Sequence, residues 1–229
     1  MKARATVLLL ATFAAGTLPS YAQIAGNRPV RRVEIDVGGG VLGGAELGSV
    51  DANLRANAQA RQPLRLFTAD SRFARAPVLR VRAGFALTRR FAVEGGLMFG
   101  RPEIRTSITA DSEGAPSLTG VERVDQYVVD ASLVMVLDGL RVGARMVPFV
   151  AGGGGYLRQL HEGQTVIEQG QVYHAGGGVK YWLLARDRGL VRATGLRGDA
   201  GVQVMRGGIS FEDRPRPHVA ISGSVFVGF

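Results

Sequence analysis

Residues 77–88 read PVLRVRAGFALT, and apolar side chains occupy every second position of this stretch. Leu79 and Phe85 share one face of an extended strand, whereas Arg80 and Arg82 share the other. Successive side chains of a strand point to opposite faces, so one face must meet an apolar medium and the other a polar one. The stretch therefore predicts a strand in the wall of a barrel that has lipid outside and a polar interior.

The same alternation recurs along the chain and predicts eight strands. They span 31–42, 77–88, 91–103, 123–137, 146–158, 171–184, 195–206 and 218–229. Because lipid offers no partner to a free strand edge, the strands must close on themselves. The predicted fold class is all-β, an eight-stranded antiparallel transmembrane up-and-down β-barrel.

The connections between these strands alternate in length. The long ones are polar and are expected to be loops: 43–76, 104–122, 159–170 and 207–217. The short ones are a tight turn at 88–90 and links at 138–145 and 185–194. Such alternation is typical of barrels whose long loops face the medium and whose short turns face the periplasm. Both chain ends are then expected on the periplasmic side.

The N-terminal residues 1–22 are typical of a cleavable export signal. Lys2 and Arg4 precede an apolar stretch at 7–18, and Ser20 and Ala22 provide the small residues that a signal peptidase reads. The apolar stretch is too short to span a bilayer as a helix, although a short membrane anchor is the alternative. We expect residues 23–30 to form a short periplasmic segment and 31–229 to form the barrel.

Composition excludes several classes of chemistry. The chain has no cysteine, which excludes disulfides, thiolate metal sites and a thiol nucleophile. The net charge of +9 suggests nucleic acid as a partner, but the arginines do not gather with aromatic residues on one stripe. We therefore expect no nucleic-acid binding, and anionic lipid phosphate is the more plausible counter-charge.

The inward face of the predicted strands collects five acids and four bases. They are Glu34, Asp36, Arg80, Arg82, Glu94, Asp130, Lys180, Arg197 and Asp199. The interior of an eight-stranded barrel is just wide enough for side chains to fill, and buried charges are tolerated when they are paired. The near balance predicts a salt-bridged plug without an open channel; a gated or proton-conducting path is the alternative.

Aromatic residues recur on the outward face, where they are expected to form girdles at the two membrane interfaces. These residues are Phe91, Phe99, Tyr127, Phe149, Tyr173 and Tyr181. The alternative is that they are core aromatics of a soluble barrel. A dry core would not tolerate the charges that share its strands, which favours the girdles.

Motifs for catalysis or cofactor binding are weak. Residues 38–43 satisfy G-x-G-x-x-G, but no βαβ unit follows. None of the three histidines has a partner at metal-ligand spacing. Position 176, two residues after His174, is Gly, and position 220, two after His218, is Ala, so a His-x-Ser pair on one strand is absent. We expect no enzymatic activity, no cofactor and no metal.

Arginines are frequent in the first long connection. They are Arg55, Arg61, Arg65, Arg72 and Arg75, against Asp51 and Asp70. Guanidinium groups near the outer leaflet could contact lipopolysaccharide phosphates or a host polyanion. A solvated loop without a ligand is an equally good interpretation.

The chain ends in Phe229, the last member of an alternating apolar strand. With the export signal and the segments PFVAGGG at 148–154 and LRGDA at 196–200, it resembles the small outer-membrane β-barrel family of OmpA/OmpX type in Gram-negative bacteria. We expect no peptidoglycan-binding domain of the kind that the two-domain members carry after the barrel.

The resemblance implies a structural or surface-interaction role through long extracellular loops. It also implies a set of partners: outer-membrane lipid and lipopolysaccharide, the barrel assembly machinery that reads a terminal Phe, and host or surface ligands. A narrow porin-like or OmpW-like conduit for small hydrophobic molecules is the alternative. A secreted ligand-binding barrel is a third class, and it requires an apolar interior.

Overall fold

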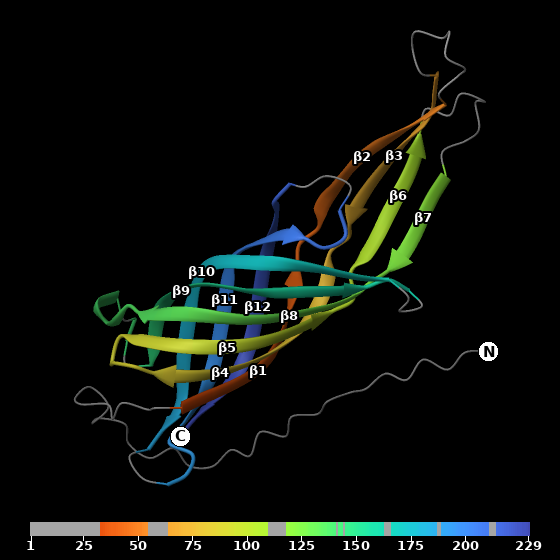
Figure 1. Ribbon diagram of the computed structural model, residues 1–229. Coiled ribbons are helices and arrows are strands. Elements are labelled where there is room, and N and C mark those ends of the chain that lie inside the picture. Colours follow the sequence, from red (N-terminus) through yellow and green to blue (C-terminus); the bar gives the residue numbers. More distant parts are fainter. Residues whose placement is uncertain are drawn as a thin grey trace, which may run out of the picture.

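Eight strands close into an antiparallel barrel in the computed structural model (Figure 1). The structure describes residues 33–54, 64–109, 118–140, 142–143, 145–162, 166–186, 189–210 and 214–229. The barrel strands are β1 (Val33–Leu42), β4 (Ala76–Ala86), β5 (Phe91–Gly100), β8 (Asp125–Val136), β9 (Met146–Leu160), β10 (Ile167–Ala185), β11 (Ala193–Gly207) and β12 (Arg216–Gly228). The predicted fold class is confirmed. The expected export signal and the 23–30 segment lie outside the described residues.

Closure is made by β1, which pairs antiparallel with β12 on one side and with β4 on the other. Val37 lies opposite Val225 in the first pairing and opposite Val81 in the second. The backbone N–H of Phe229 donates to the carbonyl of Val33 at 2.9 Å, which ties the C-terminal residue to the start of β1. No edge of the barrel is left to face lipid.

Two connections that were expected to be polar loops contain a second sheet. Its strands are β2 (Ala45–Leu54), β3 (Leu64–Phe73), β6 (Glu103–Thr109) and β7 (Leu118–Arg123), in the order β2-β3-β6-β7. We call it the projecting sheet, because it extends beyond the barrel at the end away from the C-terminus (Figure 1). The loop prediction for these connections was therefore wrong. Register shifts at Glu46/Gly48 and Ala52/Asn53 break the period of two that would have indicated strands.

A small apolar cluster joins the projecting sheet to the barrel. It consists of Leu47, Phe73, Ile104, Val124 and Ile209. Leu47 lies near the start of β2, Phe73 at the end of β3 and Ile104 near the start of β6. Ile209 comes from the link between β11 and β12. The projecting sheet is thus anchored at its base by ordinary burial of apolar side chains.

Apolar residues cover the outside of the barrel. Leu79 is 54% exposed and Phe85 is 50% exposed, whereas Arg82, on the same strand, is 5% exposed. This distribution is the reverse of a water-soluble barrel, in which burial of apolar side chains drives folding. Among the described residues, no helix is long and apolar enough to cross a membrane.

The predicted orientation of β9 is wrong. Phe149 was expected to face outward, but it is only 2% exposed and points into the lumen, while Tyr156 is 44% exposed on the outer wall. The run Gly152–Gly155 carries no side chains, so the alternation of β9 could not be followed through it. Val147, Phe149 and Leu157 therefore share the inward face with the glycines at 153 and 155.

Candidate functional site: a closed lumen and an aromatic outer wall

Arg82 lies at the centre of the charges inside the barrel. Its Nε donates to Asp36 at 2.8 Å, and its two terminal nitrogens donate to the carboxylate of Asp199 at 3.1 and 3.0 Å. One terminal nitrogen also donates to Ser224 at 3.2 Å. The β1–β4 register places Asp36 directly opposite Arg82, so the closest of these pairs is set by backbone pairing.

Arg197 is the second centre. One of its terminal nitrogens donates to both oxygens of Glu94, at 2.8 and 2.9 Å, and its Nε donates to Asp199 at 3.0 Å. The guanidinium carbon lies 4.5 Å from the centroid of the Phe149 ring. The side chain of Arg197 is 1% exposed, so its charge depends on these partners rather than on water.

Two further pairs complete the set. Lys180 bonds to Glu34 and lies 3.8 Å from Glu94, and Arg80 bonds to Asp130. All nine residues predicted for the interior therefore lie inside the barrel in ion pairs, and we call them the lumen network. With five acids and four bases, the set carries one negative charge in excess when all nine are ionised. Buried charges of this kind are tolerated because each one is paired and hydrogen-bonded.

Apolar layers lie on both sides of the lumen network. Toward the projecting sheet, the barrel interior is filled by Leu42, Met98, Val128, Leu157, Val172 and Met205, with Val78 and Ala220 packed against them. Toward the short turns, Trp182 meets Phe226 edge to face, with ring centroids 4.8 Å apart. The sequence predicted the charges but not these layers.

The end of β11 and the residues just after it are hydrogen-bonded to buried polar side chains at the barrel end near the projecting sheet. Arg216 donates to the backbone carbonyls of Gly207 and Ile209, and the N–H of Ile209 donates to the side chain of Gln159 at 2.9 Å. Gln159 in turn donates to Gln126 at 2.8 Å. Gly207 and Gly208 have φ angles of 73° and 72°, which other residues rarely adopt. These bonds hold residues 207–209 against Gln159 and Arg216 at this end of the barrel.

A cavity of about 60 Å³ lies beside the lumen network. Its lining includes Arg80, Ser132, His174 and Ser222, and the bare backbone of Gly176 and Gly201 forms part of its wall. A polar cavity of this size can hold a few waters. It is too small for an organic substrate of ordinary size.

Ser132 and His174 meet at this cavity, a contact that the sequence analysis missed. The Ser132 hydroxyl lies 2.8 Å from His174 Nε2, and His174 Nδ1 lies 3.9 Å from Asp130. A His-x-Ser motif places both residues on one strand, whereas these residues lie on β8 and β10. Both residues occupy inward-facing positions in the alternation of their strands, and this could have indicated the contact. The 3.9 Å separation is too long for the hydrogen bond that orients a catalytic His, and Asp130 is already bound by Arg80.

Metal and cofactor sites have little support in the structure. Within the described ranges, no three side chains of His, Asp or Glu are grouped so that they could hold a metal ion. The glycines at 38–43 lie in β1 and at its end, where they face neighbouring strands and do not open a helix. This context lacks the helix N-terminus that a dinucleotide phosphate requires.

The outward aromatics lie mainly at the end of the barrel that carries the projecting sheet. Tyr127 is 44% exposed and Tyr173 is 51% exposed, and Phe99 packs against Tyr127 with ring centroids 5.0 Å apart. Phe91 is 39% exposed near the short turns, while Tyr181 is half-buried. Tyr156 joins this outer set in place of Phe149. Tyr and Trp concentrate at membrane interfaces because one end of the ring is apolar and the other is polar.

Closed antiparallel pairing, an apolar outer wall and a charged interior define the class of this protein. It is an eight-stranded transmembrane β-barrel.

Comparison with solved structures finds proteins that align over most of this chain at low similarity. The N-terminal β-barrel domain of Pseudomonas aeruginosa OprF aligns over 86% of this chain and 98% of its own, at 10% identity and a TM-score of 0.37. Ail, the attachment invasion locus protein of Yersinia pestis, aligns over 85% and 99%, at 10% identity and a TM-score of 0.34. The outer membrane protease OmpT of Escherichia coli aligns over 90% and 98%, at 9% identity and a TM-score of 0.29.

No family model matches the chain, and no curated protein matches it. Because the TM-scores of these three structures lie below 0.5, the class rests on the barrel's own geometry.

Proposed function

We propose that this chain is a non-enzymatic protein of a bacterial outer membrane. Its role is structural or surface-interacting: the barrel anchors the projecting sheet outside the cell and passes no solute. The observation that carries the proposal is the placement of a four-stranded sheet at the barrel end opposite the short turns and the C-terminus (Figure 1). Long extracellular segments and short periplasmic turns are typical of outer-membrane barrels.

The projecting sheet has the features of a surface for interaction. Its order β2-β3-β6-β7 leaves β2 and β7 as edge strands with backbone groups that no strand of the described chain pairs. Val121 on β7 is 56% exposed. Host or surface ligands are the partners that such a surface suits, and Arg65, Arg72 and Arg75 lie on or beside β3. Arg55 and Arg61 lie outside the described residues.

The orientation gives a prediction for labelling of cells. Because the chain lacks cysteine, Val121→Cys and Leu140→Cys each introduce a single thiol. Both side chains are exposed, at 56% and 65%, but they lie at opposite ends of the molecule. We expect a membrane-impermeant maleimide to label V121C on intact cells and L140C only after the outer membrane is permeabilised. The reverse pattern would contradict the orientation, and recovery of the protein from the periplasm would contradict the membrane location.

The alternative role as a conduit predicts a path through the barrel. The lumen network and the apolar layer that includes Leu42 and Met205 together favour a closed interior. We expect the purified, refolded protein to show no open-channel steps in a planar bilayer, while a trimeric porin in the same chamber conducts. Reproducible single-channel steps that vanish with the protein would refute closure. A conduit for small hydrophobic molecules is tested separately, by uptake of such a solute into vesicles that contain the protein.

The absence of catalysis is part of the proposal. Ser132 is 8% exposed within the barrel. The cavity beside it, of about 60 Å³, is too small to hold a substrate next to the hydroxyl. The contact with His174 is explained as a satisfied buried hydroxyl. Lipopolysaccharide and the barrel assembly machinery remain the partners that we propose for the wall and for the C-terminal strand.

A further inference from the structure

Aromatic and cationic side chains gather on one sector of the outer wall, where β5, β8 and β9 approach the projecting sheet. The strand register places Phe99 opposite Tyr127 and Tyr127 opposite Arg158, so these three side chains form a continuous row across the strands. Arg101 follows Phe99 on the same chain segment, and Tyr156 precedes Arg158 on the same face of β9. We call these five residues the outer-wall patch.

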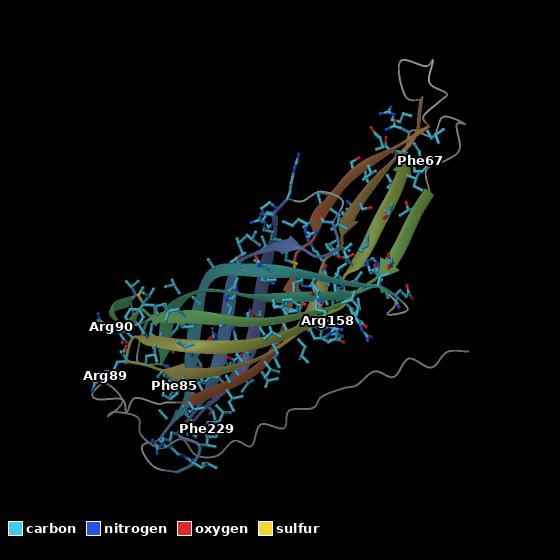
Figure 2. The ribbon with its side chains drawn as sticks, viewed as in Figure 1. Phe67, Phe85, Arg89, Arg90, Arg158 and Phe229 are labelled. Carbon is cyan, nitrogen blue, oxygen red and sulfur yellow. The ribbon has the colours of Figure 1, made fainter. Side chains whose placement is uncertain are left out.

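The two arginines of the patch have spare hydrogen-bonding capacity. Arg158 is exposed and forms no ion pair with any residue that the structure describes. Arg101 lies with its guanidinium carbon 5.5 Å from the Phe99 centroid and uses only Nε to donate to Asp125, at 2.7 Å. Its terminal nitrogens have no partner among the described residues. Figure 2 shows Arg158 at the barrel end from which the projecting sheet extends.

The surroundings of the patch fix its depth in the membrane. On the side toward the short turns, the outward residues are apolar: Leu97 is 59% exposed and Val129 is 54% exposed. On the other side, the chain leaves the barrel wall for the projecting sheet at Glu103 and Arg123. Tyr127 and Tyr156 mark the boundary between these regions, because tyrosines prefer the headgroup level of a bilayer. The Arg158 guanidinium therefore lies at the depth of lipid phosphates.

We propose that the outer-wall patch binds the phosphate of an acylated lipid in the outer leaflet. The phosphate lies between Arg101 and Arg158, and the acyl chains run over Leu97 and Val129. Guanidinium groups bind phosphate through paired, charge-assisted hydrogen bonds. A lipid is favoured over free phosphate because the cations sit directly above an apolar strip of the wall. This inference rests on the proposed membrane location and adds a defined ligand site to it.

The test uses the purified full-length protein in detergent and dioleoyl phosphatidic acid as the probe. Bound lipid is measured by native mass spectrometry, with dioleoyl phosphatidylcholine as the zwitterionic comparison. We expect wild type to prefer phosphatidic acid, and R101Q/R158Q to bind it about tenfold more weakly, as the loss of charge-assisted hydrogen bonds implies. Arg105→Gln removes an exposed arginine from the projecting sheet and is the matched control; it should bind as wild type.

Three results would overturn the inference. They are unchanged binding in R101Q/R158Q, an equal loss in R105Q, which would indicate general charge attraction, and displacement of the lipid by millimolar inorganic phosphate, which would indicate a free-phosphate site. Labelling of V121C on intact cells, with Arg101 and Arg158 both in place, separates the two proposals. If V121C is labelled on intact cells but the wild-type protein shows no preference for phosphatidic acid, only the lipid site fails.

Discussion

Replacing Arg197 by methionine is expected to destabilise the barrel by about 3–5 kcal/mol, the cost of breaking a buried ion-pair network from one side. The substitution keeps much of the side-chain volume but removes the charge that faces Glu94, Asp36 and Asp199. Those carboxylates would remain beside a site that is closed to water, since the side chain of Arg197 is only 1% exposed. Arg82 cannot replace the lost partner, because it is already bonded to Asp36 and Asp199.

The measurement is unfolding in urea from lipid vesicles. The chain has a single tryptophan, Trp182, which packs against Phe226 inside the barrel and reports on the loss of that packing. Arg105→Met, on the projecting sheet, is the matched control and should change the free energy of unfolding by no more than about 0.5 kcal/mol. An R197M midpoint equal to that of wild type would show that the lumen network does not hold the barrel closed.

Alanine at Gly178 is expected to be the second large effect, because the inner wall at this point has no room for a methyl group. A Cβ atom there would lie 2.0 Å from the carbonyl oxygen of Gly198 and 2.8 Å from the ring of Phe149. The first of these neighbours is backbone and cannot move without breaking the β10–β11 pairing. Overpacking of this kind costs about 1–3 kcal/mol or more.

Gly198 provides the control on the opposing strand. It lies directly beside this contact but faces outward, and a Cβ atom there meets nothing within 4 Å. Gly198→Ala should fold as wild type, or slightly better, because glycine inside a strand is entropically costly. The readout is the fraction of refolded protein that migrates as the compact form on an unboiled gel. Equal yields for G178A and G198A would mean that the inner wall relaxes freely around a methyl group.

The barrel strands could be predicted because each one separates two media. Leu79 and Arg82 need opposite surroundings, and only one orientation of β4 satisfies both. The same reasoning failed on β9, where four consecutive glycines remove the side chains on which the pattern depends. Phe149 was consequently placed in lipid when it packs against Arg197.

The projecting sheet could not be predicted in this way. Its two faces meet water to similar degrees along much of their length, and its strands carry bulges. Its central pairing, β3 with β6, joins segments separated by the whole β4–β5 hairpin. Periodicity contains no information about such a pairing.

The identity of the buried charges could be predicted from the alternation of inward-facing and outward-facing positions along each strand, but their partners could not. Arg82 was predicted to face inward, yet its bond to Asp199 links positions 117 residues apart. The contact between Ser132 and His174 is of the same kind, because it depends on how β8 and β10 are placed around a closed cylinder. Distances across a lumen follow from closure and stagger, which are properties of all eight strands together.

The acids on β1 have a consequence for biogenesis. Glu34 is made near the beginning of the chain, but its cationic partner Lys180 follows 146 positions later, whereas Asp36 bonds to Arg82 on β4 as well as to Arg197, 161 positions later. Until translation and export have delivered Lys180, the Glu34 carboxylate must stay hydrated, which opposes early burial of the N-terminal strand in a bilayer. We therefore expect the terminal strands to pair last, after which the ionic contacts from β1 to β10 and β11 stabilise the closed barrel.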